Sequence, residues 1–264
     1  MDLEHLYVPV SGFQMERSRV NTAGEMAHFH YHNAYEIYFL VSGSRNYIIN
    51  DKLFPLREGD VVLVPPQALH KTTGDGYERI LISFDRSYLE QSFTPEKADM
   101  LLKGFDAQMV RIPANRMVQI KLLLEKLWNE QKMQNNRFSF LYLGELLAIL
   151  QTCAANTKPS GKISDILEYI NQNYRTIEGI DQVAQQFFLS RYYLCRFFKQ
   201  YTGLSVMEYL NHIKVKNACM QITANQDSLT HVCFDCGFHS YSNFCNTFKK
   251  LTGYSPMQFK KRNQ

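Results

Sequence analysis

An eighteen-residue segment near the end of this 264-residue chain is repeated fifty residues later. Residues 190–207 and 240–257 carry the same amino acid at eight aligned positions: Ser190/Ser240, Cys195/Cys245, Phe198/Phe248, Lys199/Lys249, Thr202/Thr252, Gly203/Gly253, Ser205/Ser255 and Met207/Met257. Chance does not produce such agreement. The last hundred residues are therefore predicted to fold as two copies of one unit with a connector between them.

Each copy has the pattern of a capped helix that follows a tight turn. A serine begins the helix, where its hydroxyl can accept a backbone N–H, and a glycine ends it in the left-handed conformation. A shorter helix is predicted before each copy, over residues 181–187 and 230–236. Helix, tight turn and capped helix is the helix-turn-helix pattern. The buried faces are predicted to be Leu194, Phe197 and Tyr201, then Phe244, Phe248 and Leu251.

One helix over residues 206–222 is predicted to connect the two units. At about 1.5 Å per residue it spans roughly 25 Å, enough to hold two units about one DNA turn, ~34 Å, apart. Residues 160–264 contain twelve Lys and Arg against seven Asp and Glu, whereas the rest of the chain is nearly neutral. A basic helical domain favours a nucleic-acid partner.

Two motifs in this part of the chain resemble the AraC/XylS (arabinose-regulator) family over residues 163–261. The first is S-x-x-x-L-x-R-x-F-K-x-x-x-G from Ser190, and the second is G-F-x-x-x-x-x-F-x-x-x-F-K-K-x-x-G-x-S-P from Gly237. The resemblance implies a transcription regulator that binds double-stranded promoter DNA, and it leaves RNA polymerase as a further partner to consider. Carried over position by position, the DNA-binding residues would be Ser190, Arg191, Tyr192, Cys195, Arg196, Lys199, Ser240, Tyr241, Ser242, Cys245, Asn246 and Lys249.

These residues are expected to differ in role, because some side chains suit base edges in the DNA grooves and others suit phosphates. Arg196 is the best candidate for a base contact, because arginine pairs bidentately with guanine edges, and Asn246 is suited to adenine. Lys199, Lys249 and the capped helix N-termini are expected to contact phosphates. Many family members are basic on the second helix, so the second unit is expected either to bind more weakly or to serve mainly for positioning. For Ser242 and Asn246, ordinary solvent exposure is an equal alternative.

The first ninety residues are rich in short β-type runs, at 36–41, 46–49, 60–64 and 79–84. Several short strands at this spacing predict a small barrel or sandwich. From about residue 94 the pattern becomes helical, with an apolar face at Met117, Ile120, Leu124 and Leu127 and a nearly all-apolar helix over 138–154. These helices either pack on the barrel or form a homodimer interface, and both interpretations stay open.

The sequence therefore predicts two domains: an all-β barrel domain with trailing helices, and an all-α domain with two helix-turn-helix units. The first spans residues 1–157, including a helical dimerisation segment at about 94–155, and the second spans residues 158–264. The polar segment 156–161 is the predicted hinge between them.

Three histidines and a glutamate lie within nine residues of the barrel domain: His28, His30, His32 and Glu36. Residues two apart on a strand project to the same face, so these histidines are predicted to converge.

This spacing also resembles the two motifs of the cupin family. The matching residues are Gly24, His30, His32, Glu36 and Gly43 for the first motif, and Gly59, Pro65 and His70 for the second. The second motif departs from the family pattern at Gln67, where a glycine is usual, and at Gly74, where an asparagine is usual. The resemblance supports a β-barrel over residues 10–90, which is also the usual front domain of arabinose-type regulators.

In metal-binding cupins the matching ligands are those at His30, His32, Glu36 and His70, a set suited to Fe, Mn, Ni or Zn. Regulators of this family often keep such residues and hold a small organic effector, commonly a sugar. We therefore predict a ligand-binding set of His30, His32, Glu36, Tyr38 and His70 with no metal or other cofactor and no catalysis. A metal-assisted sensor, a purely structural cluster and a metal-dependent cupin enzyme with an appended DNA-binding domain are the alternatives.

Six cysteines all lie beyond residue 150, at positions suited to helical cores rather than to a disulfide framework. Cys233 and Cys236 have the C-x-x-C spacing without a second pair, so they are expected to be structural rather than zinc ligands. The first ten residues show no secretion signal, and no apolar run is long enough to span a membrane. We expect a cytoplasmic protein.

Overall fold

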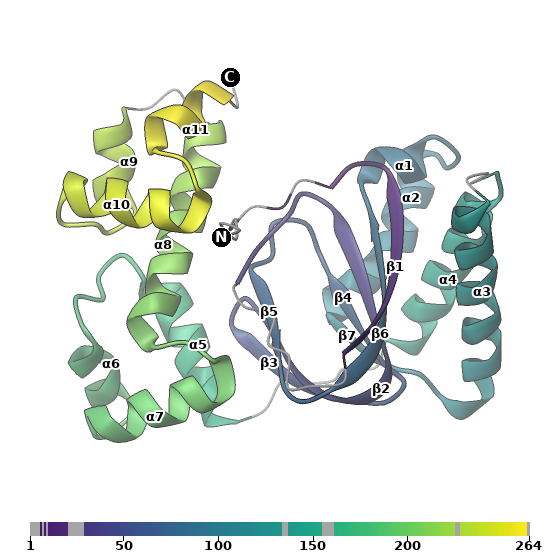
Figure 1. Cartoon of the computed structure of the whole chain (residues 1–264), viewed down its shortest axis with the longest axis horizontal. Coiled ribbons are helices and arrows are strands. Elements are labelled where there is room, and N and C mark those ends of the chain that lie inside the picture. The colour runs from purple at the N-terminus through teal and green to yellow at the C-terminus, as the bar shows by residue number, and fades with distance from the viewer. Residues whose placement is uncertain are drawn as a thin grey trace.

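The computed structural model describes residues 6, 8, 10–20, 29–133, 137–154, 161–224 and 228–262. A curved antiparallel sheet occupies the middle of the molecule, with one group of helices on each side of it (Figure 1). The helices on one side follow the sheet directly in the chain, and those on the other side make up the C-terminal part. This arrangement confirms the predicted fold class.

The sheet has seven strands: β1 (Phe13–Val20), β2 (Tyr35–Ile49), β3 (Lys52–Arg57), β4 (Asp60–Val64), β5 (His70–Thr73), β6 (Tyr77–Phe84) and β7 (Met109–Arg111). The long strand β2 organises it, since β4 and β6 pair with its first part and β3 and β5 pair with its second part. The sequence predicted two strands here. A register shift between Leu40 and Ser42, beside Gly43 at φ 94°, lets one bent strand continue instead.

Helices α1 (Arg86–Glu90), α2 (Pro95–Leu102), α3 (Ala114–Lys132) and α4 (Ser139–Cys153), with a 3₁₀ turn at Lys103–Ala107, cover one face of the sheet. Ile120, Leu124 and Leu127 are buried as predicted, and Met117 is half-buried. They share one apolar core with α4 and with the outward face of β2, so α4 packs on the barrel. Strand β7 was not predicted in this helical stretch, because its three residues are extended through pairing with β4 rather than through a local pattern.

The C-terminal helices are α5 (Lys162–Asn173), α6 (Ile180–Gln186), α7 (Arg191–Thr202), α8 (Val206–Ala224), α9 (Leu229–Asp235), α10 (Tyr241–Thr252) and α11 (Pro256–Arg262). Helix α8 runs between the two units, with α6 and α7 at one end and α9 and α10 at the other (Figure 1). The short helices begin one residue earlier than predicted, and the connector is two residues longer. Most of the predicted hinge lies in residues 155–160, outside the described residues, so the domain boundary stays a prediction.

The barrel and the C-terminal helices share an apolar core. Phe29, Tyr31 and Leu69 of the barrel belong to the same cluster of buried residues as the cores of α5, α8 and α10. The Phe29 and Tyr209 rings lie edge to face with centroids 5.2 Å apart, and the Tyr209 hydroxyl donates a hydrogen bond to the Asn50 carbonyl. The two halves are therefore docked through apolar contacts as well as hydrogen bonds.

Candidate nucleic-acid interface and buried histidine site

Helices α7 and α10 begin and end at the repeated residues. The Ser190 hydroxyl accepts the Tyr193 N–H at 3.3 Å, and the Ser240 hydroxyl accepts the Asn243 N–H at 3.4 Å. Each helix ends at a glycine in the left-handed region, with φ 70° in the first unit and φ 78° in the second. These caps fix the length of both helices at twelve residues.

The buried face of α7 differs from the predicted one. Leu194, Phe198 and Thr202 are buried, whereas the predicted Phe197 and Tyr201 are only half-buried. The aromatic pattern was misleading, because the rings of Tyr193, Phe197 and Tyr201 contact one another along the side of the helix, with successive centroids 5.5 and 5.0 Å apart.

In α10, Phe244 and Phe248 are buried as predicted and Leu251 is half-buried. The repeated threonines complete both buried faces: Thr202 accepts the Leu204 N–H at 3.1 Å, and Thr252 accepts the Tyr254 N–H at 3.2 Å. The repeat carried this signal, since the pairs Thr202/Thr252 and Phe198/Phe248 are identical in the two copies.

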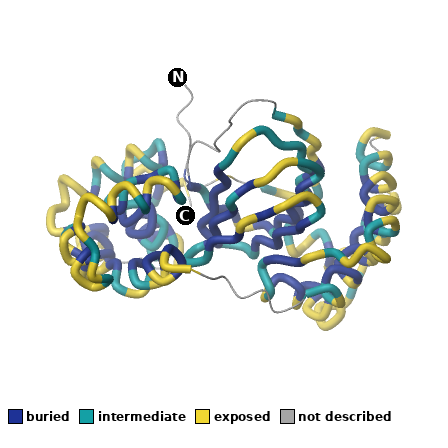
Figure 2. The backbone as a smooth tube through the Cα atoms, turned by 90° about the horizontal axis from the view of Figure 1, so that it is seen from below, coloured by how far each residue is buried: buried dark blue, intermediate teal, exposed yellow. Residues whose placement is uncertain are grey.

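The predicted DNA-binding residues lie on the outer faces of α7 and α10, which Figure 2 shows among the exposed parts of the helical half. All twelve are exposed except Cys245, which is half-buried. Tyr192 is 88 % exposed, whereas Tyr241 is 40 % exposed and its ring lies 5.9 Å from that of Phe244. Both faces are free of the barrel and are available to a partner.

The two arginines of α7 differ in their surroundings. Arg191 forms an exposed ion pair with Asp181 at 3.1 Å, which ties it to the preceding helix. Arg196, one turn further on, forms no ion pair with any described residue. Its guanidinium is therefore free to reach into a groove, consistent with its predicted role as a base contact.

Sequence reasoning missed the structures that follow each helix. The Ser205 N–H donates to Glu208 Oε2 at 2.8 Å, and the Ser255 N–H donates to Gln258 Oε1 at 2.9 Å. These are two capping boxes, and the repeated Ser-x-x-Glu/Gln spacing could have revealed them. Phe188, in the turn of the first unit, was also missed. It is 96 % exposed at φ 53°.

The second site is a buried histidine cluster inside the barrel. His30 and His70 pair through their backbones, with N–H···O distances of 3.1 and 2.9 Å. One ligand atom from each of His30, His32, Glu36 and His70 lies within 4.8 Å of the others. His32, Glu36 and His70 are buried and His30 is half-buried. The structure thus brings together four of the five predicted ligand-binding residues.

Hydrogen bonds orient the side chains of this cluster. Nδ1 of His70 lies 2.9 Å from the Ala68 carbonyl, so this nitrogen donates and Nε2 presents its lone pair to the site. That Nε2 is buried and has no hydrogen-bond partner among the described residues. Burial, together with the neighbouring His30, holds the pKa of His70 well below its usual value, so the ring is neutral.

The Glu36 carboxylate is held by two neighbours. Tyr47 donates to Oε1 at 2.8 Å, and His32 Nε2 lies 3.1 Å from Oε2. Burial by itself would raise the pKa of Glu36, but the hydrogen bond from His32 and the nearby imidazoles lower it below its usual value. Glu36 is therefore ionised, and Tyr47 is a supporting residue that the sequence did not identify as such.

Tyr38 lies two residues along β2 from Glu36. The centroid of its ring lies 5.1 Å from that of the Tyr47 ring, and burial raises the pKa of Tyr38 to about 12. Its buried hydroxyl has no hydrogen-bond partner among the described residues. As a residue two positions from Glu36 on the same strand, Tyr38 shares the face of β2 that carries Glu36. The predicted His28 lies outside the described residues.

The C-x-x-C pair forms no such site. Cys233 and Cys236 are buried in the second unit, and burial raises the pKa of Cys236 to about 12, which keeps the thiol neutral. Within the described part of the chain, His30, His32, Glu36 and His70 form the one group that could hold a metal ion. The structural role expected for the cysteines agrees with their burial.

Comparison with known proteins connects both sites to a family. Residues 183–262 match the helix-turn-helix domain model, and residues 19–82 match the cupin domain model. The transcriptional activator RhaS of Escherichia fergusonii is 22 % identical over 240 residues, covering 88 % of this chain and 86 % of that protein. The Msm operon regulatory protein of Streptococcus mutans is 24 % identical over 243 residues, covering 87 % and 85 %.

This chain has the domain order of AraC/XylS regulators, a cupin domain followed by an AraC-type helix-turn-helix domain. With this helix-turn-helix domain, and with transcription regulators as relatives over most of its length, it is a DNA-binding transcription regulator. Among solved structures it is similar to ToxT of Vibrio cholerae, with 12 % identity, coverage of 95 % of this chain and 97 % of that chain, and a TM-score of 0.40. No helix in the described part of the chain is long and apolar enough to cross a membrane.

Proposed function

We propose that this regulator controls transcription in response to a small molecule held inside the barrel. The observation that carries the proposal is the buried cluster, in which ionised Glu36 and the Nε2 lone pair of His70 face the same space. Burying a polar atom is costly unless a partner satisfies it, and His70 Nε2 has no hydrogen-bond partner among the described residues, whereas Glu36 is held by Tyr47 and His32. The first effector class that we propose is a sugar. It would lie beside the cluster, toward the Tyr38 hydroxyl, because imidazole, carboxylate and phenol groups form hydrogen bonds with sugar hydroxyls.

A divalent metal ion is the second candidate effector. The specific observation is that four ligand atoms converge within 4.8 Å, while the Nδ1 atoms of His32 and His70 are each held by a carbonyl at 2.9 Å. Carbonyls that orient the far ring nitrogen are typical of metal-bound histidines. A bound ion would supply positive charge between Glu36 and the imidazoles. A metal-dependent enzyme would use the same residues, but the relatives are regulators, which favours sensing.

The strands that carry the cluster also contact the DNA-binding half. His30 and His70 point into the barrel, whereas their neighbours Phe29, Tyr31 and Leu69 belong to the core shared with α8. This follows from the alternation of side chains along a strand. An effector that shifts the His30–His70 pair would therefore shift the residues that hold α8. The response requires that the effector bind one arrangement better than the other.

The effector proposal predicts a specific change in thermal stability. A bound sugar or divalent cation should raise the melting temperature of the full chain in a dose-dependent way. At a hundredfold excess over Kd it should add about 2.7 kcal/mol to the free energy of unfolding. Replacing His30→Ala together with His70→Ala should abolish that shift, because both side chains face the bound effector. Screens against sugars, and against Zn²⁺, Ni²⁺, Mn²⁺ and Fe²⁺ with and without chelator, separate the two classes.

The matched control is His239→Ala, because His239 is exposed in the second unit and far along the chain from the cluster. It should leave the shift unchanged. A shift retained in the double variant would remove these histidines from the effector site. Turnover of a substrate that requires the metal would replace the regulator proposal for the barrel by the enzyme alternative.

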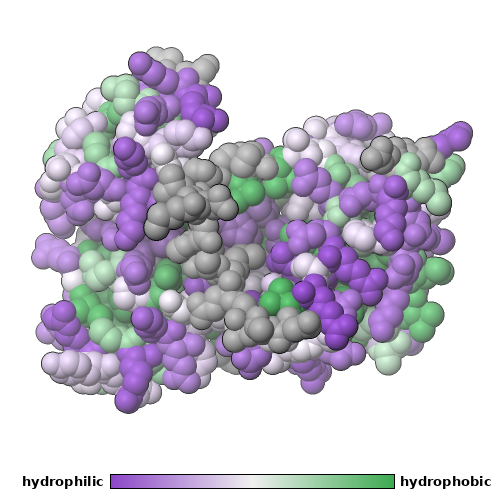
Figure 3. Space-filling view, in the orientation of Figure 1, coloured by the Kyte–Doolittle hydropathy of each residue, from purple (hydrophilic) through white to green (hydrophobic). Residues whose placement is uncertain are grey.

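We further propose that the chain acts in the cytoplasm as an activator that contacts RNA polymerase. We also propose that it forms a homodimer through α3. Support for the dimer comes from Val118 and Leu122, which are 78 % and 56 % exposed and one helical turn apart. Hydrophobic surface is visible at the edge of the molecule where α3 lies (Figure 3). Two such residues on one helix face can pair with the same face of a second chain.

Replacing Val118→Lys together with Leu122→Lys is expected to yield a monomer, because lysines facing each other across a two-fold axis repel. Thermal stability should be nearly unchanged, since both side chains are exposed. Sedimentation velocity measures the oligomeric state, and Lys121→Ala between the two positions is the control that should remain dimeric. A monomeric wild-type chain, or a double variant that still dimerises, would exclude α3 as the interface.

A further inference from the structure

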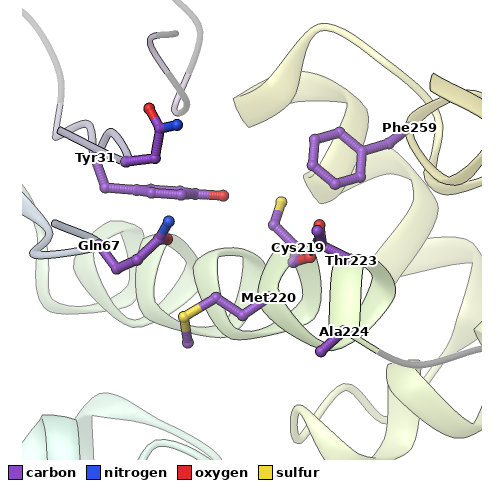
Figure 4. A pocket seen from close by; sticks show the side chains of 8 residues that line it. Tyr31, Gln67, Cys219, Met220, Thr223, Ala224 and Phe259 are labelled. Carbon is purple, nitrogen blue, oxygen red and sulfur yellow. Dashed lines mark hydrogen bonds between the residues drawn. The ribbon is translucent and has the colours of Figure 1, made fainter. Parts of the chain in front are cut away.

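A cavity of about 360 Å³ lies outside the barrel, where the barrel meets the C-terminal helices. Tyr31 and Gln67 line it from the barrel, Cys219 and Met220 from α8, and Phe259 from α11 (Figure 4). Small-molecule sites commonly measure about 300–1,000 Å³ and lie between domains. The cavity is separate from the histidine cluster, because Tyr31 belongs to the core shared with α8 while His30 and His32 face the barrel interior.

One polar atom of a residue that lines this cavity lacks a partner. The Gln67 N–H donates to the His32 carbonyl at 2.8 Å, which anchors its backbone, and its side chain lines the cavity (Figure 4). Gln67 Oε1 is buried and has no hydrogen-bond partner among the described residues. A buried acceptor without a donor is unfavourable, so a ligand that draws the Gln67 amide toward the cavity and supplies a donor to Oε1 would be favoured.

The other walls are uncharged and mostly apolar, although Asn33 and Thr223 also contribute polar side chains. The Tyr31 ring, the Met220 thioether and the Phe259 ring offer surfaces that pack well against an aromatic or alicyclic body. Burial raises the pKa of Cys219 to about 12, so its thiol is neutral. The residues described as lining the cavity include no Lys, Arg, Asp or Glu, which disfavours a charged ligand.

We propose that this cavity is a ligand site for a small uncharged molecule with an apolar body and a hydroxyl or N–H group that donates to Gln67 Oε1. Its walls come from both halves of the chain, so its occupant stabilises the docked arrangement of the barrel against α8 and α11. The site is additional to the effector site in the barrel and does not depend on it.

Three matched probes test the proposal on the full chain: benzyl alcohol, benzyl methyl ether, which lacks the donor, and phenylacetate, which is charged. We expect benzyl alcohol to bind about five-fold more tightly than the ether, because the alcohol can form one more hydrogen bond. Phenylacetate should bind most weakly of the three. Ligand-observed NMR titration measures the affinities. Gln67→Met removes the acceptor and should bring the alcohol-to-ether ratio to about one, whereas Gln91→Met, at an exposed helix end, should preserve it.

A second variant fills the cavity without touching Gln67. Ala224 lies on its α8 wall and is exposed, so Ala224→Trp should fold and should abolish binding of all three probes. Equal affinities of the alcohol and the ether for the wild-type chain would overturn the proposal, as would a retained preference in Gln67→Met. Unchanged binding of benzyl alcohol to Ala224→Trp would place its site elsewhere.

Discussion

Replacing Gly237→Ala is expected to destabilise the DNA-binding half by about 2–5 kcal/mol. Gly237 lies in the turn of the second unit at φ 78°. An added Cβ would lie 2.5 Å from the Arg175 carbonyl oxygen and 2.7 Å from the Arg175 Cα. Both are backbone atoms of the turn that follows α5, and they cannot move aside as a flexible side chain would. The carbonyl of Gly237 also accepts the hydrogen bond of buried Lys214 at 2.6 Å, so any displacement disturbs a second contact.

Urea denaturation followed by far-UV circular dichroism measures this loss. The matched control is Gly12→Ala, because Gly12 has a similar φ of 67° and an added Cβ would meet nothing within 4 Å. It should cost about 1 kcal/mol, the conformational part alone. Equal losses in the two variants would show that the contact with Arg175 is not tight.

The first unit shows why the contact decides the effect. Phe188 occupies the corresponding position, two residues after the end of α6, at φ 53°. It carries a large side chain there because that side chain is 96 % exposed. The left-handed backbone is therefore tolerated in both turns, and only the second turn requires glycine for space.

Replacing Arg196→Ala is expected to weaken specific DNA binding by about 1–3 kcal/mol, roughly 5–150-fold, and to relax the preference at one base position. Arg196 is exposed on α7 and unpaired among the described residues, so its guanidinium is available for a guanine edge. Affinities for the best site and for unrelated DNA, measured at one salt concentration, give the specific part of the loss.

Lys199→Ala is the matched comparison for this variant. Lys199 is exposed on the same helix and is proposed to contact phosphate, so its removal should weaken binding to all sequences alike. A uniform loss in Arg196→Ala as well would reduce Arg196 to a phosphate contact.

The repeat predicted the C-terminal helices closely because its signals are local. Serine caps and glycine stops act within one turn of the helix they bound, so α7 and α10 could be located from sequence. The buried face of α7 was predicted less well. Thr202 reads as polar in sequence, and only its bonds to neighbouring backbone groups allow it to be buried.

Features that depend on distant residues could not be predicted from local patterns. The spacing on one segment indicated His30, His32 and Glu36, whereas His70 was predicted only through the cupin resemblance, because its approach to them is set by strand pairing forty residues further along the chain. The support of Glu36 by Tyr47 and the cavity at Gln67 depend on tertiary contacts in the same way. A local pattern identifies residue types, whereas partners are fixed by the fold.

We propose that α7 and α10 read two successive major grooves, held apart by the nineteen residues of α8. Methylation interference tests it most directly, on a DNA site selected from a random library, with the wild-type chain and with Arg196→Ala. We predict two clusters of interfering guanines or adenines for each bound chain, about one helical turn, ~10 base pairs, apart. Arg196→Ala should remove interference from one cluster and leave the other. A single cluster for each bound chain, or equal changes in both clusters, would contradict the account.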